Sequence, residues 1–531
     1  MPALWFTVPP TCEWRGILSA LRRAGYSVHR EPGLRARLLY LDTHDGRLGR
    51  AGIRLRLEAA GQLAQWRTAG PEGEESTAPI QVPAPGRTFS AEALGLPAGV
   101  LEAVRGHPLI PYLAAVARRL SCALVSPSGA RLAMILESQA PRSPRDRRTR
   151  GPGRGMLTVA LAEGEGAALR HLGTYLRDRL GLSPEAQDLP ALGLKALGRV
   201  EPGGPVPEGL KVRAADSLAA AARKVVAQQA LKMRANTEGT LEDLDPEYLH
   251  DLRVATRRLR SALRLFGPAL GPRRAESLRA ELAWVGRLLG AVRDLDVFIA
   301  NLRVQEVRLG ESAPVASLLA RELEERRVPA REALVSALSG RRFAALMRRL
   351  ETLGASPAPR SARGLARLPV AQVGPAMVRK ANRRVLALGR SVTGTSPPGQ
   401  LHRLRILFKR LRYACEFFRE AFEDLEPFIR AMVRFQDCLG EHQDAVVAMG
   451  RIRSLAAELA AQGKIPPEAL LDLGALLQVQ REIAADRRLR LGDLWKKFDR
   501  PSVRRIPRGL GAKVRAGGSS GEPETNLPPG P

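Results

Sequence analysis

One segment occurs twice in this chain, and its repetition limits what the chain can fold into. LHDLRVATRRLRSALRLF, residues 249–266, aligns without a gap with LHRLRILFKRLRYACEFF, residues 401–418, at an offset of 152. Leu, His, Leu, Arg, Arg, Leu, Arg and Phe recur at the same places in both copies. Two copies of so specific a segment predict an internally duplicated domain.

Each copy has the pattern of an amphipathic helix. At about 100° per residue, one side of the first copy is apolar, with Leu252, Leu259, Leu263 and Phe266. The other side carries a basic stripe within an arc of about 80°, formed by His250, Arg253, Arg257 and Arg260. The second copy rebuilds this stripe with His402, Arg405, Lys409 and Arg412. We therefore predict two helices that bury one face and present cations on the other.

Further matches extend the repeat beyond these helices. Leu-Gly-x-x-x-Asp recurs at residues 289–294 and 439–444, at an offset of 150. A looser match at an offset of 156 pairs Arg223 and Lys224 with Arg379 and Lys380, which are secondary candidates for anion binding. We interpret Asp294 and Asp444 as helix caps or as salt-bridge partners of the basic helices. Arg258 and Arg410, identical in the two copies, lie about 100° from the middle of the stripe and are candidates for its rim.

The duplicated region is predicted to be all-α over residues 211–497, with repeats at about 211–353 and 370–497. Asp245-Pro246-Glu247 is a typical start for the first basic helix, and Gly267-Pro268 and Gly271-Pro272 read as breaks after it. Other helices are expected at 214–234, 273–290, 294–309, 314–338, 341–353, 370–392, 425–439, 441–461 and 467–496.

Residues 1–198 have a different texture, with short β-like segments between Gly and Pro turns. We expect strands near 38–43, 53–59, 63–69, 131–138 and 156–164, and helices near 12–24, 109–120 and 167–180. This pattern predicts an α+β domain on an antiparallel sheet that could be closed. Residues 199–210 read as a Pro/Gly linker, and residues 501–531 as a disordered basic and Gly/Pro-rich tail.

Charge indicates the class of partner. The chain has 84 Lys and Arg against 54 Asp and Glu in 531 residues, a formal net charge of +30. Such an excess favours a polyanion, and arginine suits bidentate contact with phosphate oxygens. Aromatic residues are only 4%, which leaves little material for stacking on bases. The four cysteines form no CxxC pair, and neither a signal peptide nor an apolar span is apparent, so we expect a cytoplasmic protein.

The N-terminal part resembles the CYTH fold of the triphosphate tunnel superfamily. The residues that carry the resemblance are Tyr40, Asp42 and Thr43, followed by RLGRAGIRLR at 47–56. The resemblance implies a fold in which arginines such as Arg54 and Arg56 line a tunnel and grip phosphates. It also implies metal-binding glutamates on an opening ExExK strand and on a later ExE strand. Residues 3–7 and 157–161 contain none, so we expect the hydrolytic activity to be lost.

The two basic helices and the Leu-Gly-x-x-x-Asp segments resemble the CHAD family, the conserved-histidine α-helical domain. DPEYLHDLRVATRRLR at 245–260 matches the first family pattern, and LHRLRILFKRLRY at 401–413 matches the second. The resemblance implies two pseudo-symmetric helical bundles with a basic groove between them that binds inorganic polyphosphate.

The sequence thus predicts non-catalytic binding of polyphosphate, with polyphosphate granules as a candidate location. No catalytic residue, metal ligand or cofactor is predicted. Two alternatives stay open. A metal-dependent triphosphatase would use the N-terminal domain with Mg²⁺ or Mn²⁺, and a nucleic-acid-binding module would use the same positive charge. A solvated helix face is the plain interpretation of any basic stripe, but two matching stripes almost without acidic residues argue against it.

Overall fold

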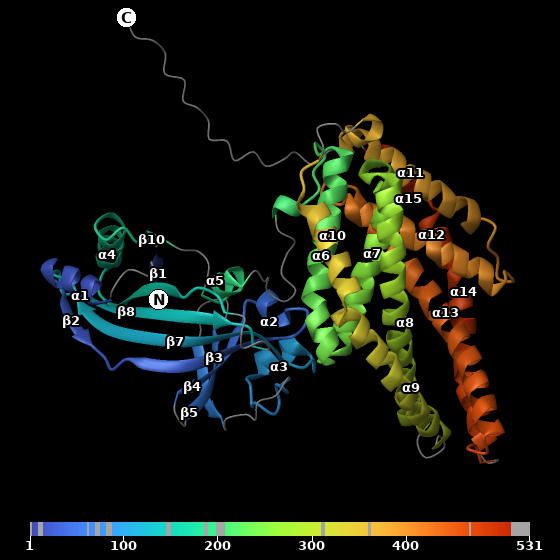
Figure 1. Ribbon diagram of the computed structural model, residues 1–531, viewed down its shortest axis with the longest axis horizontal. Helices are drawn as coiled ribbons and strands as arrows, with labels where there is room; N and C mark the ends of the chain where they lie inside the picture. The colour runs from blue at the N-terminus through green and yellow to red at the C-terminus, as the bar shows by residue number, and fades with distance from the viewer. Residues whose placement is uncertain are drawn as a thin grey trace, which may run out of the picture. The chain divides into compact units, whose positions relative to one another are not determined.

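The computed structural model describes residues 3–8, 14–60, 63–69, 75–80, 88–144, 150–184, 189–197, 208–309, 314–358, 363–466 and 469–510. The chain divides into two compact units, residues 1–205 and 206–531 (Figure 1). Most of the expected linker, and the tail after residue 510, lie outside the described residues.

The first unit is built on an antiparallel sheet. Its strands are β1 (Ala3–Val8), β2 (Ser27–Arg30), β3 (Leu34–Asp42), β4 (Arg54–Ala60), β5 (Leu63–Ala69), β6 (Glu75–Ile80), β7 (Ile110–Val125), β8 (Arg131–Arg142), β9 (Arg154–Glu163) and β10 (Ser183–Pro184). Their order is β10-β1-β9-β8-β7-β3-β4-β5-β6, and β2 also pairs with β7. Among the described strands no pairing joins β6 to β10, so the sheet is open where a closed one was a candidate.

In the described part of this unit, five helices accompany the sheet: α1 (Trp14–Arg23), α2 (Arg47–Arg50), α3 (Ala98–Val104), α4 (Gly166–Asp178) and α5 (Leu189–Ala196). α1 and α4 cover the β1–β9–β8 part of the sheet through Ile17, Leu21, Leu172 and Leu176. α3 closes a smaller core against β3, β4 and β5. The fold is thus the α+β class that the sequence predicted.

The expected helix at 109–120 is wrong, because this segment is the long central strand β7. Its alanines, leucines and arginines suit a helix when read alone. In the sheet, however, residues 111–118 alternate between buried and less buried positions, and β7 pairs with β3 on one side and β8 on the other. Pairing on both edges overrides the local helical preference.

The second unit is entirely helical in its described residues. Its helices are α6 (Leu218–Glu242), α7 (Pro246–Leu270), α8 (Pro272–Leu309), α9 (Pro314–Ser339), α10 (Arg341–Ala355), α11 (Val370–Gly389), α12 (Pro398–Phe417), α13 (Leu425–Ala461), α14 (Ala469–Phe498) and α15 (Pro501–Gly509). The described residues add two short 3-10 turns, at Glu208–Leu210 and Gly364–Ala366. The all-α prediction for this region is confirmed.

Four helices differ from the expected ones. Residues 273–309 form the single helix α8, and residues 425–461 form the single helix α13, because a glycine inside a helix costs only about 1 kcal/mol and does not end it. Gly267-Pro268 lies inside α7, which ends only before Gly271. Residues 501–509, expected in the tail, form α15.

The apolar faces of the two basic helices meet in one core. Leu252, Leu259, Leu263 and Phe266 of α7 are all at most 1% exposed, as predicted. Phe266 packs against Phe417 and Phe418 of the second copy, with ring centroids 6.1 and 5.7 Å apart. α7 begins as predicted, since the Asp245 carboxylate accepts a hydrogen bond from the backbone N–H of Glu247 at 2.7 Å.

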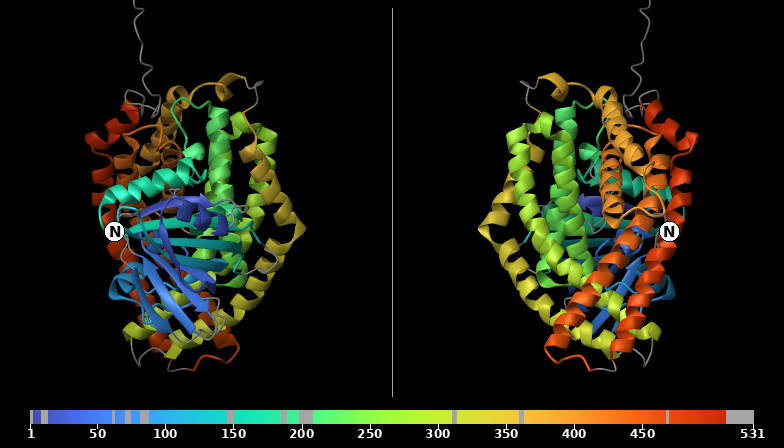
Figure 2. Two further views of the ribbon diagram at one scale, coloured as in Figure 1. Left: turned by 90° about the vertical axis from the view of Figure 1, so that its left-hand side faces the viewer. Right: turned by 90° about the vertical axis from the view of Figure 1, so that its right-hand side faces the viewer.

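A second apolar cluster joins the far ends of two long hairpins, α8–α9 and α13–α14. The two hairpins can be followed in the right-hand view of Figure 2. Leu302 of α8 and Ile452 of α13, which correspond at the repeat offset of 150, both belong to this cluster. Corresponding residues of the two copies therefore share a core.

Candidate functional site

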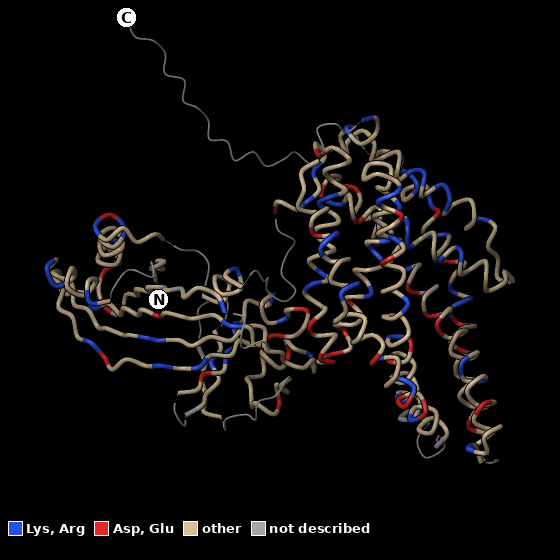
Figure 3. Tube along the Cα trace, in the orientation of Figure 1, with Lys and Arg blue, Asp and Glu red and all other residues tan. Residues whose placement is uncertain are grey.

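The two basic stripes come together at the middle of the helical unit. Arg253 and Arg257 of α7 lie close to Arg405 and Lys409 of α12, and Arg293 of α8 completes the group. We call Arg253, Arg257, Arg293, Arg405 and Lys409 the central cluster. Basic residues also recur along the other helices of this unit (Figure 3).

Electrostatic strain is concentrated on Lys409. Burial, followed by the charges of Arg405 and Arg257, lowers the pKa of its ammonium to about 7, although Asp444 acts in the opposite direction. Burial also lowers the pKa of Arg253. Asp294 acts to raise that pKa, and the charges of Arg257, Arg293 and Arg405 act to lower it further. The cations of the central cluster are thus close enough to repel one another.

Two aspartates partly compensate this charge, and they do so in the same way in both copies. Arg253 Nη2 donates to Asp294 Oδ1 at 3.2 Å, and Arg405 Nη2 lies 3.6 Å from Asp444 Oδ1. Asp294 also accepts from Arg451 Nη2 at 3.4 Å. Both aspartates lie inside long helices, so the capping role is wrong and the salt-bridge role is confirmed.

The glycine of each Leu-Gly-x-x-x-Asp segment supports an arginine of the central cluster. A Cβ atom at Gly290 would lie 3.8 Å from Arg253 Nε, and one at Gly440 would lie 3.4 Å from Arg405 Nη2. Each guanidinium therefore rests on a helix surface without a side chain. This explains why Leu-Gly and Asp recur together with the basic helices.

The histidines are less central than the sequence suggested. Burial and then Arg293 lower the pKa of His250, which places its ring at the Arg293 side of the cluster. His402 is exposed and makes no hydrogen bond or ion pair within the described part of the chain.

The remaining arginines of the two stripes and of their predicted rim do not join the central cluster. Arg258 Nη1 lies 2.8 Å from Glu416 Oε2, and Arg412 Nε lies 3.4 Å from Glu416 Oε1. The Arg258 guanidinium also lies over the rings of Tyr413 and Phe417, 5.5 and 5.8 Å from their centroids. Arg258 therefore stabilises the α7–α12 contact, and Arg412 is paired within α12, whereas Arg260 and Arg410 lie near a different group of arginines.

The secondary candidates are dispersed. Arg223 is 5% exposed and donates to the carbonyl oxygen of Ala219 at 3.0 Å, and Lys224 is paired with Asp216 at 2.8 Å. Arg379 is half-buried and Lys380 is exposed on α11. No contact places these four with the central cluster among the described residues.

Sequence reasoning missed Arg293 and underestimated Arg264. Arg293 corresponds to Gln443 in the other copy, so the repeat gave no signal for it. Arg264 lies one turn beyond Arg260 on the same stripe, but Glu416 stands at its place in the second copy, so the repeat gave no signal for it either.

In the first unit, a polar network occupies one face of the sheet. Arg56 Nε lies 2.6 Å from Glu58 Oε1, and Arg119 Nη2 donates to Glu137 Oε2 at 2.7 Å. Burial acts to raise the pKa of Glu58. The charges of Arg56, Arg119 and Arg67 outweigh this effect and hold that pKa below its ordinary value. Sequence reasoning missed both glutamates because it looked for carboxylates at residues 3–7 and 157–161, whereas Glu58 and Glu137 lie on β4 and β8.

This network does not fit a divalent metal. Each carboxylate already faces a guanidinium, and a cation would have to displace that partner. Arg56 is held in the same network and near Tyr40, whose pKa burial raises to about 12, so it is not free to grip a phosphate. Arg54 lies near Asp42, which caps α2 by accepting from the backbone N–H groups of Leu48 and Gly49, each at 2.9 Å.

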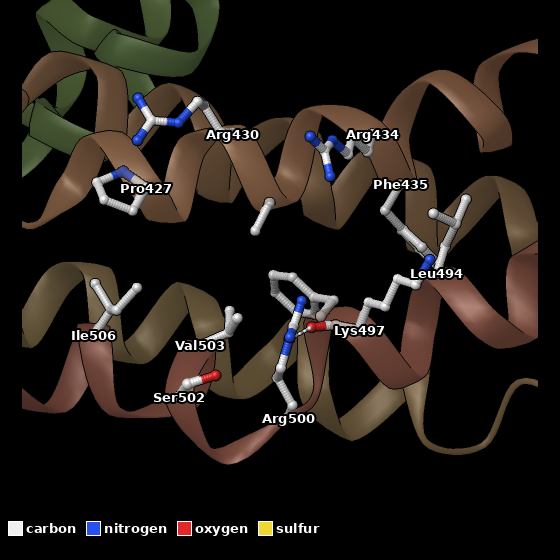
Figure 4. A pocket seen from close by; sticks show the side chains of 12 residues that line it. Pro427, Arg430, Arg434, Phe435, Leu494, Lys497, Arg500, Ser502, Val503 and Ile506 are labelled. Carbon is white, nitrogen blue, oxygen red and sulfur yellow. Dashed lines mark hydrogen bonds between the residues drawn. The ribbon is translucent and has the colours of Figure 1, made fainter.

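A hollow in the second unit is lined by none of the predicted site residues. It opens between α13, α14 and α15, with Phe435, Leu494, Val503 and Ile506 inside and Arg430, Arg434, Lys497 and Arg500 around it (Figure 4). Its arginines do not belong to either basic stripe.

The fold and the site define a protein with an antiparallel-sheet unit followed by a helical unit that gathers cations from a duplicated helix. Residues 224–453 match the family model of the CHAD domain, so the helical unit carries a CHAD domain. No helix among the described residues has the length and apolarity needed to cross a membrane.

Known proteins similar to this chain include one full-length relative and several solved structures. An uncharacterised protein of Mycobacterium tuberculosis is 26% identical over 529 residues, covering 93% of this chain and 94% of that protein. The CHAD domain of the plant Ricinus communis is 26% identical with a TM-score of 0.44, covering 58% of this chain and 98% of that one. A putative adenylyl cyclase from Hippeastrum, described as having a dominant triphosphatase activity, is 14% identical with a TM-score of 0.26, covering 38% of this chain and 97% of that one.

Proposed function

We propose that this protein binds inorganic polyphosphate in the central cluster without hydrolysing it. The observation that carries the proposal is that Arg253 and Arg257 of one helix lie close to Arg405 and Lys409 of another. The repulsion between these cations, together with burial, lowers the pKa of Lys409. Like charges held together in a folded protein are relieved when an anion neutralises them.

The residue types favour a phosphate chain over other polyanions. Guanidinium groups bind phosphate oxygens bidentately and need no base to stack on. The central cluster contains no aromatic side chain, whereas single-stranded nucleic acids are held largely by stacking. A nucleic acid is therefore the weaker candidate, and polyphosphate granules are the location that this activity would give the protein.

The triphosphatase alternative is not favoured. Residues 3–7 of β1 and 157–161 of β9 contain no carboxylate, and the glutamates on β4 and β8 are paired with arginines. We propose instead that the polar network stabilises the sheet.

The test replaces one arginine from each copy. We expect the double variant Arg253→Gln, Arg405→Gln to bind long-chain polyphosphate more than about a hundredfold less tightly, since a charged hydrogen bond contributes roughly 1.5–3 kcal/mol. Each single change should cost less. The measurement is a binding titration at several salt concentrations, and log affinity should fall linearly with log salt, less steeply in the double variant.

A matched control removes two charges elsewhere. Arg348 and Arg453 are exposed helical arginines without an ion pair in the described ranges, so Arg348→Gln with Arg453→Gln should change affinity little. Thermal melting checks that both variants fold. Unchanged affinity in a folded Arg253→Gln, Arg405→Gln protein would contradict the proposal, and equal or tighter binding of duplex DNA or RNA would favour the nucleic-acid alternative.

A further inference from the structure

A second group of arginines lies next to the central cluster. Partial desolvation, and then Arg279, Arg264 and Arg287, lower the pKa of Arg260. The pKa of Arg410 is lowered in the same way, by desolvation and then by Arg264, Arg384 and Arg279. Arg264 and Arg279 are common to both sets, so the group is continuous. We call it the flanking patch: Arg260, Arg264, Arg279, Arg287, Arg384 and Arg410.

The flanking patch is almost uncompensated. Arg279 is paired with Glu276 on the same helix. Within the described residues, no carboxylate pairs with the other five arginines, and all five are exposed. An ordinary solvated surface intersperses both signs of charge, which this surface does not.

The duplication supplies an internal comparison. At the repeat offsets of 152, 150 and 156, each position of the patch has a counterpart in the other copy. Arg260, Arg264 and Arg279 correspond to Arg412, Glu416 and Ile429. Arg287, Arg384 and Arg410 correspond to Asp437, Gln228 and Arg258. Six arginines thus correspond to two arginines, two carboxylates and two uncharged residues.

The difference centres on one pair of corresponding contacts. Glu416 neutralises Arg258 at 2.8 Å and Arg412 at 3.4 Å. The corresponding position 264 is arginine, and there it faces Arg410 and Arg260. The two copies have therefore kept the same packing but differ in charge on one side.

Continuity with the central cluster indicates what the flanking patch binds. Arg257 of the central cluster is followed by Arg260 and Arg264 on the same stripe of α7, within two helical turns. We propose that the flanking patch is a second anion-binding surface that extends the central cluster on one side only. When a polyphosphate chain is longer than the central cluster, the flanking patch holds the part of the chain that extends beyond it. This inference rests on the proposed function and adds to it a direction for the bound chain.

The test installs at position 264 the acid found at its counterpart. Arg264→Glu should weaken binding of long-chain polyphosphate by at least about tenfold, since it removes one charged contact and neutralises its neighbours. Binding of tripolyphosphate, which is short enough for the central cluster, should change by less than about twofold. Arg453→Glu makes the same charge change outside both sites and is the control, and Arg264→Gln serves if Arg264→Glu does not fold.

The outcomes separate this inference from the function on which it rests. If Arg264→Glu and Arg453→Glu bind long-chain polyphosphate equally well, the flanking patch is not a binding surface, and a loss in Arg253→Gln, Arg405→Gln would still uphold the central cluster. If tripolyphosphate and long chains weaken equally in Arg264→Glu, position 264 belongs to the central cluster and the one-sided extension is wrong. If neither set of variants loses affinity, the proposed function itself fails.

Discussion

At the scale of single residues, the central feature is the conflict that burial and neighbouring cations create at Lys409. Its ordinary pKa of 10.5 falls to about 7 in the folded protein. The corresponding residue in the first copy is Arg257, which stays charged at any accessible pH. Lys409 is thus the one member of the central cluster that can lose its charge near neutral pH. In the unliganded protein it also lowers stability below pH 7, and this penalty is lifted as pH rises towards 10.5.

This conflict predicts the pH dependence of binding. A bound phosphate raises the pKa of Lys409, so binding is tightest below pH 7, where Lys409 is protonated in both states, and weakens as pH rises above 7. Lys409→Arg keeps the charge and should flatten the profile. Polyphosphate affinity measured from pH 6 to 9 checks this, and identical profiles for the two proteins would contradict it. His250 does not account for the same window, because its pKa lies below the ordinary value of 6.5.

At the scale of elements, α8 and α13 serve as platforms for arginines that belong to other helices. Gly290 and Gly440 leave room for the guanidinium groups of Arg253 and Arg405, and Asp294 and Asp444 hold those groups four residues further along the same helices. A glycine within a helix costs about 1 kcal/mol relative to alanine. Here each glycine leaves the space in which the guanidinium of Arg253 or Arg405 lies on the helix.

We predict that Gly440→Leu weakens polyphosphate binding by about tenfold, because the new side chain displaces Arg405 and costs about one charged contact. Gly450 gives the matched control: it lies on the same helix, and a Cβ atom there would have no neighbour within 4 Å. Gly450→Leu should leave affinity unchanged and raise the melting temperature slightly. Equal affinities of the two variants would show that the platform does not position Arg405.

At the scale of the whole molecule, each unit has its own electrostatic arrangement. The helical unit compensates the cations of its two adjacent groups only in part, whereas the sheet unit pairs its interior arginines with Glu58 and Glu137. The repeated contacts in the helical unit, and the shared core of Leu302 and Ile452, support the predicted pseudo-two-fold relation between residues 211–353 and 370–497. That relation and the exact repeat boundaries stay predictions.

The arrangement of the sheet unit predicts that the purified protein releases no phosphate from triphosphate with Mg²⁺ or Mn²⁺. A phosphate-release assay over several hours checks this. Robust release that disappears in Glu58→Gln or Glu137→Gln would contradict it. Melting curves must accompany these variants, because removing one partner of a buried ion pair costs about 3–5 kcal/mol and could unfold the unit.

The sequence was sufficient for the faces of the two basic helices and for the start of α7, which depend on neighbours along the chain. Helical periodicity placed the basic and apolar faces of residues 249–266 and 401–418, the duplication showed that both faces recur, and Asp245 marked the start of α7. Local patterns succeed here because side chains three and four residues apart share a helix face in any environment.

Contacts between distant segments determined the rest. Residues 109–120 became the central strand β7 because partners on both edges outweigh helix propensity. The stripe that the sequence treated as one surface divides into the central cluster, the flanking patch and the pair with Glu416, since each arginine meets charges from other helices. Charges act through space rather than along the chain, so only the folded arrangement decides which cations are neutralised and which remain available to an anion.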